Sequence, residues 1–395
     1  MNKISLTIIT LLMLGLVISS CENNESFPAD YYNCTFSFAD SSSIHPKAGI
    51  YQEFLDRNRK QGIIGATLMV KDRFGVWIGA SGKADLTSNI VMKPCNSFLI
   101  ASISKVFTAT AIFSYIDDGL LSLEDPVNKW VSSSITDKIK NANESKIKHL
   151  LSHTSGIADY YTTQFELDRI NRIYNSWTQE DVLKYVYGKK PTNGVGETYY
   201  YSNTNYLLLS LILEKASGLR LEEVYKEKIF APLNLTSGYY SAEKPIPYGT
   251  VKGYVDIYGN GQYVESEFLY KDEIGIGGDG GIVMNAYDLG KFFENLMKGN
   301  LISSSSLSEM TNWFDLPQDW VDEDFGHFQN GYGLEHNKTP YGNSVGHTGG
   351  IDGFLSIAQY FPDEDATFVL LVNSGSYDNQ PRLNIYNETL KEMFK

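Results

Sequence analysis

A serine and a lysine three positions apart, Ser102 and Lys105, are the first residues of this sequence that could do chemistry together. On a helix, side chains at that spacing share a face, so the Lys105 amine can reach the Ser102 hydroxyl. A serine hydroxyl is a weak nucleophile at neutral pH, and a lysine whose pKa is lowered by burial can be its base. Taken alone, the pair fits a helix-capping serine and a solvated lysine better, because Ser-x-x-Lys occurs by chance in many chains.

The tripeptide Tyr201-Ser202-Asn203 follows glycines and a run of tyrosines, which predicts a loop. The Tyr201 phenol can carry a proton where a cation holds it partly ionised. The Asn203 amide can both donate and accept, so it can orient a lysine or a substrate amide. By itself the tripeptide is better explained as a turn with a packed tyrosine.

The segment His347-Thr348-Gly349-Gly350 lies just before a predicted strand near Phe354. Two glycines let a substrate approach the backbone closely, and the Gly350 N–H can face an oxyanion. The Thr348 hydroxyl can bind a carboxylate, and His347 can donate a proton or supply positive charge. The alternative for this segment alone is a glycine turn with an incidental histidine.

Together and in this order, the three segments resemble the penicillin-recognising serine hydrolases. The resemblance is to the branch that holds class C β-lactamases, D-Ala-D-Ala carboxypeptidases and related esterases, and it covers about residues 45–390. Shorter segments agree with it, at residues 150–156, 280–283, 285–289, 332–334 and 369–373.

The resemblance implies a mechanism for this chain. Ser102 attacks a carbonyl carbon, and Lys105 and Tyr201 take its proton and relay it to the leaving group. The backbone N–H groups of Ser102 and Gly350 form the oxyanion hole, and water then hydrolyses the acyl-enzyme. Asn203, His347, Thr348 and Gly349 are the implied substrate-binding residues.

One position departs from class C β-lactamases, which typically have a lysine where this chain has His347. Histidine is only partly charged near pH 7, so we expect weaker binding of a substrate carboxylate and weak β-lactamase activity. On this reasoning, His347→Lys should raise reactivity toward carboxylate-bearing β-lactams.

The first prediction of function is therefore a D-Ala-D-Ala carboxypeptidase acting on cell-wall peptides. The alternatives are an esterase or amidase on small substrates, a class C-like β-lactamase and, from another class, a penicillin-binding sensor without efficient turnover. Acylation without product release would favour the sensor.

Other signals are weak or argue against further partners. A formal net charge of −14 disfavours nucleic acid. His149 and His153 have helical spacing but lack the glutamate of a His-Glu-x-x-His zinc site, and the glycine-rich run at 275–280 lacks a dinucleotide-binding context. We expect no metal and no cofactor, and the sequence does not indicate an oligomeric state.

The first 20 residues predict a lipoprotein signal peptide. Lys3 precedes an apolar run too short to span a bilayer, and Ser19-Ser20-Cys21 resembles a bacterial lipobox. Cleavage before Cys21 and lipidation of its sulfur would anchor the protein in the cell envelope, facing the periplasm or the cell surface. An ordinary signal peptide with an incidental cysteine is the alternative.

Two more cysteines, Cys34 and Cys95, are consistent with either a disulfide in an exported protein or two buried thiols. The sequence does not separate these alternatives.

Strand-like segments lie near both ends of the chain and helical patterns lie between them. We predict an α+β fold, in which an antiparallel sheet from the N- and C-terminal segments is flanked by helices. Residues 21–44 are predicted to be a tether and residues 45–395 the hydrolase domain, with a mainly helical insertion at about 120–290. Predicted elements of the sheet and its flanks are helices at 47–59, 103–118 and 383–393 and strands at 63–70, 76–80, 354–361 and 367–372.

Overall fold

Two strands from opposite ends of the chain pair at the centre of the main sheet. Strand β1 (Gly65–Asp72) lies antiparallel to β14 (Ala366–Val372) in the computed structural model. Every residue of β14 is buried, as expected for a strand covered on both faces. The predicted α+β fold, with its sheet built from both ends, is confirmed. The structure describes residues 28–36, 42–171, 177–240, 247–256, 258–266, 277–375 and 380–395.

In the described residues the sheet has the order β3-β2-β1-β14-β13-β12-β11-β10-β9. The predicted hairpin near the N-terminus is present, with Asp72 opposite Gly75 at its turn. Strands β12 and β13 form a second hairpin, which carries the third candidate segment of the sequence. The remaining bounds are β2 (Gly75–Asp85), β3 (Ile90–Val91), β9 (Phe314–Asp315), β10 (His327–Asn330), β11 (Glu335–Thr339), β12 (Gly342–Ile351) and β13 (Phe354–Phe361).

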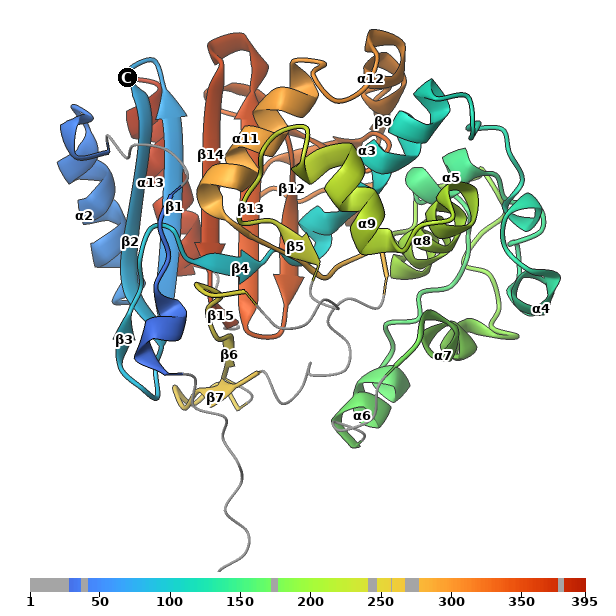
Figure 1. Ribbon diagram of the computed structural model, residues 1–395, viewed down its shortest axis with the longest axis horizontal. Coiled ribbons are helices and arrows are strands. Elements are labelled where there is room, and N and C mark those ends of the chain that lie inside the picture. Colours follow the sequence, from blue (N-terminus) through green and yellow to red (C-terminus); the bar gives the residue numbers. More distant parts are fainter. Residues whose placement is uncertain are drawn as a thin grey trace, which may run out of the picture.

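Helices cover both faces of the sheet (Figure 1). On one face, α2 (Ala48–Arg59) and α13 (Gln380–Met393) bury an apolar layer. On the other face, α11 (Ala286–Met297) packs on the central strands and begins at Asn285, whose side chain accepts the Asp288 N–H. The apolar pattern predicts that Ile50, Phe54 and Leu55 share the buried side of α2, but Ile50 is 39% exposed and Tyr51 is buried instead.

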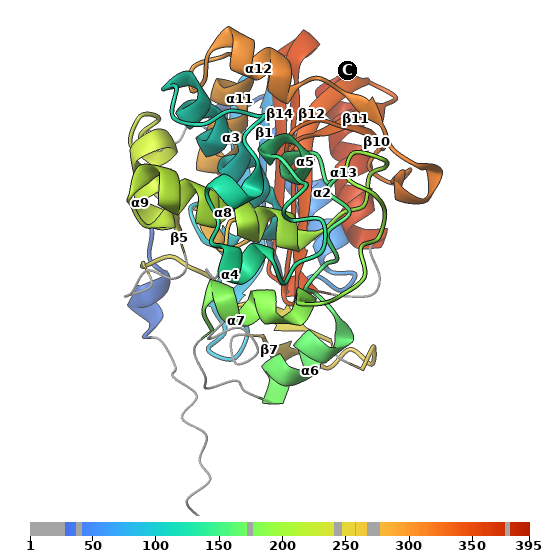
Figure 2. The ribbon, with the colours of Figure 1, turned by 90° about the vertical axis from the view of Figure 1, so that its right-hand side faces the viewer.

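Helix α3 (Ser104–Asp117) lies on the same side of the sheet as α11, next to the helical insertion (Figure 2). The apolar pattern predicts one buried face, but nearly every side chain from Ser104 to Phe113 is buried. A helix buried all round places any polar group it carries in a low-dielectric setting. Gly119 follows with φ +73°, a left-handed conformation that suits glycine and ends the helix where the sequence predicts.

The predicted insertion at about 120–290 is mainly helical in the described residues, and it packs beside α3. It also carries short strands, which form two small sheets with β4 (Ser97–Leu99) and β15 (Ser374–Gly375). Its helices are η4 (Val127–Lys129), α4 (Ser133–Thr136), α5 (Ile147–Leu151), α6 (Thr163–Asn171), α7 (Gln179–Leu183), η5 (Lys184–Val186), α8 (Asn203–Ser217), α9 (Leu221–Tyr225) and η6 (Lys226–Phe230). Its strands are β5 (Tyr239–Tyr240), β6 (Tyr254–Val255), β7 (Val264–Glu265) and β8 (Ile282–Asn285). Outside the insertion lie η1 (Ala29–Tyr32), η2 (Ser42–Ile44), η3 (Ala101–Ile103), α12 (Ser304–Met310), η7 (Gln318–Trp320) and η8 (Pro362–Glu364).

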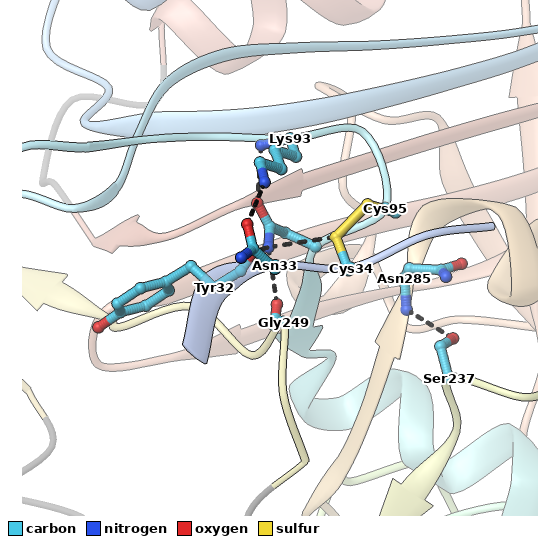
Figure 3. Close-up of a disulfide and its surroundings, with 9 residues drawn as sticks. Tyr32, Asn33, Cys34, Lys93, Cys95, Ser237, Gly249 and Asn285 are labelled. Carbon is cyan, nitrogen blue, oxygen red and sulfur yellow. Dashed lines mark hydrogen bonds between the residues drawn. A yellow bond between two sulfur atoms is a disulfide. The ribbon is translucent and has the colours of Figure 1, made fainter. Parts of the chain in front are cut away.

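The predicted tether is docked on the domain along residues 28–36. A disulfide joins Cys34 to Cys95, with 5.8 Å between the Cα atoms (Figure 3). Tyr31 and Tyr32 are buried in the core, and the Asn96 side-chain amide donates to the Tyr32 carbonyl at 3.2 Å. Of the two alternatives for the cysteines, the structure therefore has the bridge, and an independent tether cannot include residues 28–36.

The predicted signal peptide and lipidation site, including Cys21, lie outside the described residues. Within the part of the chain that the structure describes, none of the helices combines the length and the apolar character needed to cross a membrane.

Candidate active site

The candidate nucleophile, Ser102, lies in the short helix η3 at the entrance to α3. The preceding residue, Ala101, has φ +51°, a left-handed conformation that costs an alanine roughly 1–2 kcal/mol. Such strain is typical of places where the backbone must aim a functional group. The turn presents Ser102 to a cavity and leaves Lys105 on the buried helix behind it.

The Lys105 amine donates to the Ser102 hydroxyl at 3.0 Å and to the Asp279 carbonyl oxygen at 2.8 Å. Its side chain is fully buried, and burial lowers the pKa of the amine to about 8, although three nearby carboxylates oppose the shift. At neutral pH roughly one amine in ten is therefore uncharged and can accept a proton. The distance and the lowered pKa both suit a general base for Ser102.

Tyr201 lines the same cavity as Ser102, and the Lys105 amine lies 5.0 Å from the centre of its ring, so the second candidate segment does reach the first. Burial raises the pKa of this phenol far above its ordinary value, and the nearby Ser102 offsets only part of the effect. Tyr201 therefore keeps its proton in the resting state. This geometry suits Lys105 to take the Ser102 proton and Tyr201 to donate one to a leaving group.

His153 fixes the plane of the Tyr201 ring. The two rings stack with 4.4 Å between centroids, and the Ser202 backbone N–H donates to His153 Nδ1 at 3.1 Å. Because Nδ1 accepts that bond, the ring is held as the neutral tautomer with its proton on Nε2. Burial and the nearby Lys105 also lower the pKa of His153 well below its ordinary value.

Ser102 and Tyr201 open on a cavity of about 510 Å³ that we call the reaction cavity. Gly350 lies on its wall, consistent with the predicted oxyanion hole formed by the Ser102 and Gly350 N–H groups. The remaining lining residues are Ala101, Tyr160, Tyr161, Glu166, Asn203, Val255, Asp256, Asp279, Gly280, Ile351, Asp352, Leu355 and Gly375.

Asn203 reaches the reaction cavity from the first turn of α8. Its side-chain amide donates to Asp159 at 3.0 Å, and its backbone N–H donates to the same carboxylate at 3.1 Å. Burial raises the pKa of Asp159 to about 6. Asp159 thereby holds Asn203 with its amide at the cavity wall, where it can meet a substrate.

His347 and Thr348 lie elsewhere than their predicted role suggests. His347 lines a second cavity, of about 190 Å³, which shares Tyr201 with the reaction cavity and which we call the rear cavity. The Thr348 backbone and hydroxyl donate to Glu335 at 3.0 and 3.1 Å. Gly349 packs so closely that an added Cβ would lie 2.3 Å from the Ile100 carbonyl oxygen. Of the third segment, only Gly350 is on the wall of the reaction cavity.

Four residues around the site were not predicted from the sequence: His153, Asp159, Asp279 and Glu335. Asp279 accepts from Tyr160 at 2.6 Å through its side chain and from Lys105 through its carbonyl. Two of the four are adjacent to segments that resemble the family. Asp279 directly precedes the glycine pair at 280–281, and Glu335 directly follows the segment 332–334. No spacing rule marks Asp159, and the sequence favoured a structural role for His153.

A family comparison covers almost the whole described domain. Residues 49–390 match the family model described as Beta-lactamase. The chain belongs to the β-lactamase family. With the geometry above, this makes it a serine hydrolase of the β-lactamase type, as the sequence segments predicted.

One relative with a similar sequence is a penicillin-binding protein. A penicillin-binding protein of Bacillus subtilis (strain 168) is 30% identical over 305 residues, which are 74% of this chain and 64% of that protein. This chain therefore spans less than two thirds of that relative's length.

Solved structures agree on the β-lactamase-family fold. A D-stereospecific amidohydrolase from Streptomyces sp. superposes with a TM-score of 0.75 and 25% identity, over 86% of this chain and 98% of that one. A structure described as an octameric penicillin-binding protein homologue from Pyrococcus abyssi has a TM-score of 0.73 and 26% identity, over 87% of this chain and 77% of that one.

Proposed function

We propose that this β-lactamase-family hydrolase cleaves amide bonds of D-amino-acid peptides or amides through an acyl-enzyme at Ser102. The observation that carries the proposal is the 3.0 Å contact between the Lys105 amine and the Ser102 hydroxyl on the wall of the reaction cavity. A buried lysine with a pKa of about 8 is a competent base, and a competent base favours turnover over idle binding. The similar D-stereospecific amidohydrolase supports the choice of substrate.

The D-Ala-D-Ala carboxypeptidase predicted from the sequence is one member of this substrate class and stays a prediction. Esterase and β-lactamase activities use the same acyl-enzyme, so the site alone does not separate them. A panel of D- and L-amino-acid amides, acyl-D-Ala-D-Ala peptides, short esters and a chromogenic cephalosporin distinguishes them by relative kcat/KM.

Labelling with a fluorescent fluorophosphonate tests the mechanism. We expect the wild type to be labelled once per chain and Ser102→Ala not at all. Ser305→Ala, a serine exposed on α12, is the matched control and should label like the wild type. Equal labelling of Ser102→Ala would remove Ser102 as the nucleophile, and a stoichiometric adduct without turnover of any panel member would indicate a sensor.

We also propose that the protein is a lipoprotein of the cell envelope, anchored through Cys21. The sequence segment Ser19-Ser20-Cys21 supports this, as does the Cys34–Cys95 disulfide, since such bridges persist in oxidising compartments. Mass spectrometry of the protein from membranes should find Cys21 as a lipidated N-terminal residue. An unmodified Cys21 in the mature protein would contradict the anchor.

A further inference from the structure

A buried carboxylate, Glu335, lies at the start of β11 beside the third candidate segment. It accepts the Thr348 backbone N–H at 3.0 Å and the Thr348 hydroxyl at 3.1 Å. His347 Nδ1 lies 3.4 Å from the same carboxylate and also against the Thr348 carbonyl oxygen. Two acceptors around Nδ1 require this nitrogen to carry the ring proton.

These contacts keep Glu335 ionised although it is buried. Burial acts to raise the pKa of the carboxyl, but His347 and the donors of Thr348 lower it below its ordinary value. Hydrogen bonds to a charged acceptor are the stronger kind, so the donors are held firmly. The Thr348 hydroxyl and the His347 ring are the groups that the sequence offered to a substrate carboxylate, and the chain's own carboxylate already occupies them.

The reaction cavity adds a second, independent barrier to a carboxylate. Glu166, Asp256, Asp279 and Asp352 line it, and its described lining residues include no lysine, arginine or histidine. Asp256 stays ionised, because backbone N–H groups such as that of Gly261 lower its pKa. Asp352 is paired with Arg169 at 3.0 Å, and the Asp279 carboxylate accepts the Tyr160 hydroxyl at 2.6 Å. An incoming carboxylate would meet like charge.

We propose that Glu335 determines substrate class by acting as an internal carboxylate. It fills the carboxylate-binding donors of β12 and so restricts the enzyme to acyl substrates whose leaving group has no free carboxylate, namely neutral amides and esters. Selectivity of this kind works against substrates with a free carboxylate, because their binding donors are occupied and the cavity repels their charge. It needs no added contacts to neutral amides or esters. The inference rests on the proposed acyl transfer at Ser102 and sharpens its substrate.

A matched pair of peptides tests the proposal. We compare N-acyl-D-Ala-D-Ala with its C-terminal amide, which differ only in the charge of the leaving group. The wild type should cleave the amide with at least a tenfold higher kcat/KM. Glu335→Gln, which keeps the shape and one acceptor for Thr348, should reduce that ratio at least tenfold, mainly by raising kcat/KM for the acid.

The ratio is the readout because Glu335 also influences the pKa of Lys105, and that influence is common to both peptides. Glu144→Gln, an exposed residue, is the matched control and should keep the wild-type ratio. Equal cleavage of acid and amide by the wild type, or an unchanged ratio in Glu335→Gln, overturns the proposal. If Glu335→Gln does not fold, the wild-type ratio alone decides.

Failure of the proposed function gives a different result. In that case fluorophosphonate does not label Ser102 and neither peptide is cleaved. Both the acyl transfer at Ser102 and the role of Glu335 would then be wrong. Labelling of Ser102 with preferred cleavage of the acid retains the hydrolase and removes the role of Glu335.

Discussion

The two cavities that share Tyr201 differ in what their polar groups are free to do. On the wall of the reaction cavity, the Ser102 hydroxyl accepts from the Lys105 amine at 3.0 Å, and the Tyr201 phenol lines the same cavity. In the rear cavity, His347 and Glu335 bond to β12 or to each other, and His153 holds the ring of Tyr201. The comparison indicates that the catalytic motifs have separate roles. The residues of the reaction cavity are placed to react with substrate. In the rear cavity, His153 positions Tyr201 and Glu335 occupies the hydrogen-bond donors of β12.

The largest effect should come from the base on the reaction side. Lys105→Ala removes the proton acceptor 3.0 Å from Ser102, and we expect acylation to slow by about a hundredfold or more. Lys391→Ala, an exposed lysine on α13, should leave the rate unchanged. Stopped-flow or fluorescent labelling measures the rate. A loss of less than about threefold would take Lys105 out of the mechanism.

Tyr201, which both cavities share, should come next. Tyr201→Phe keeps the ring that stacks on His153 but removes the proton donor, so we expect a loss of kcat of about tenfold to a hundredfold. Tyr206→Phe is the matched control, since its hydroxyl donates to the Leu151 carbonyl at 3.0 Å. It should cost about 1 kcal/mol of stability and little activity. Equal losses in the two variants would mean that the Tyr201 hydroxyl is structural.

His347→Lys tests whether Glu335 keeps a cation at this position from a substrate carboxylate. The sequence alone predicts that this change raises reactivity toward carboxylate-bearing β-lactams. In the structure the new lysine would lie beside Glu335 and pair with it, so we expect a gain of about threefold or less. Hydrolysis of a chromogenic cephalosporin measures it. A gain above about tenfold would show that Glu335 does not prevent a cation at position 347 from binding the substrate carboxylate.

The smallest effect is on stability and isolates the burial of Lys105. Its folded-state pKa of about 8 lies below the ordinary 10.5, so the unfolded chain binds the proton more tightly between these values. The free energy of unfolding of the wild type should therefore rise with pH relative to Lys105→Met, by up to about 1.4 kcal/mol per pH unit in that window. Urea unfolding at pH 8 and pH 10 measures the difference. A constant difference would mean that the amine is not buried as described.

Much of the scaffold could be predicted from sequence because its signals are local. Strand β13 has the bounds that its apolar run predicts, and Gly119 ends α3 as expected. The face of α2 was wrong, because Ile50 and Tyr51 are both apolar and only packing decides which one is buried. The docking of residues 28–36 depends on a disulfide to a residue 61 positions away, and no local pattern encodes that pairing.

In the candidate site, too, local contacts could be predicted from the sequence and long-range contacts could not. Ser102 and Lys105 are one helical turn apart, so their contact follows from spacing. The partner of Thr348 is 13 positions away on a neighbouring strand, and Asp159 meets Asn203 across 44 positions. These partners are set by strand register and by the packing of the insertion. The sequence could therefore name the reacting groups but not the carboxylates that hold or occupy them.

The rate of Ser102 labelling as a function of pH tests the central claim most directly. A neutral fluorophosphonate is reacted with the full chain, and peptide mapping identifies the modified residue. We predict an adduct on Ser102 whose rate rises about tenfold per pH unit and levels off above about pH 8, as Lys105 loses its proton. A rate that does not change with pH through that region, or an adduct on another residue, would contradict a mechanism in which Lys105 activates Ser102.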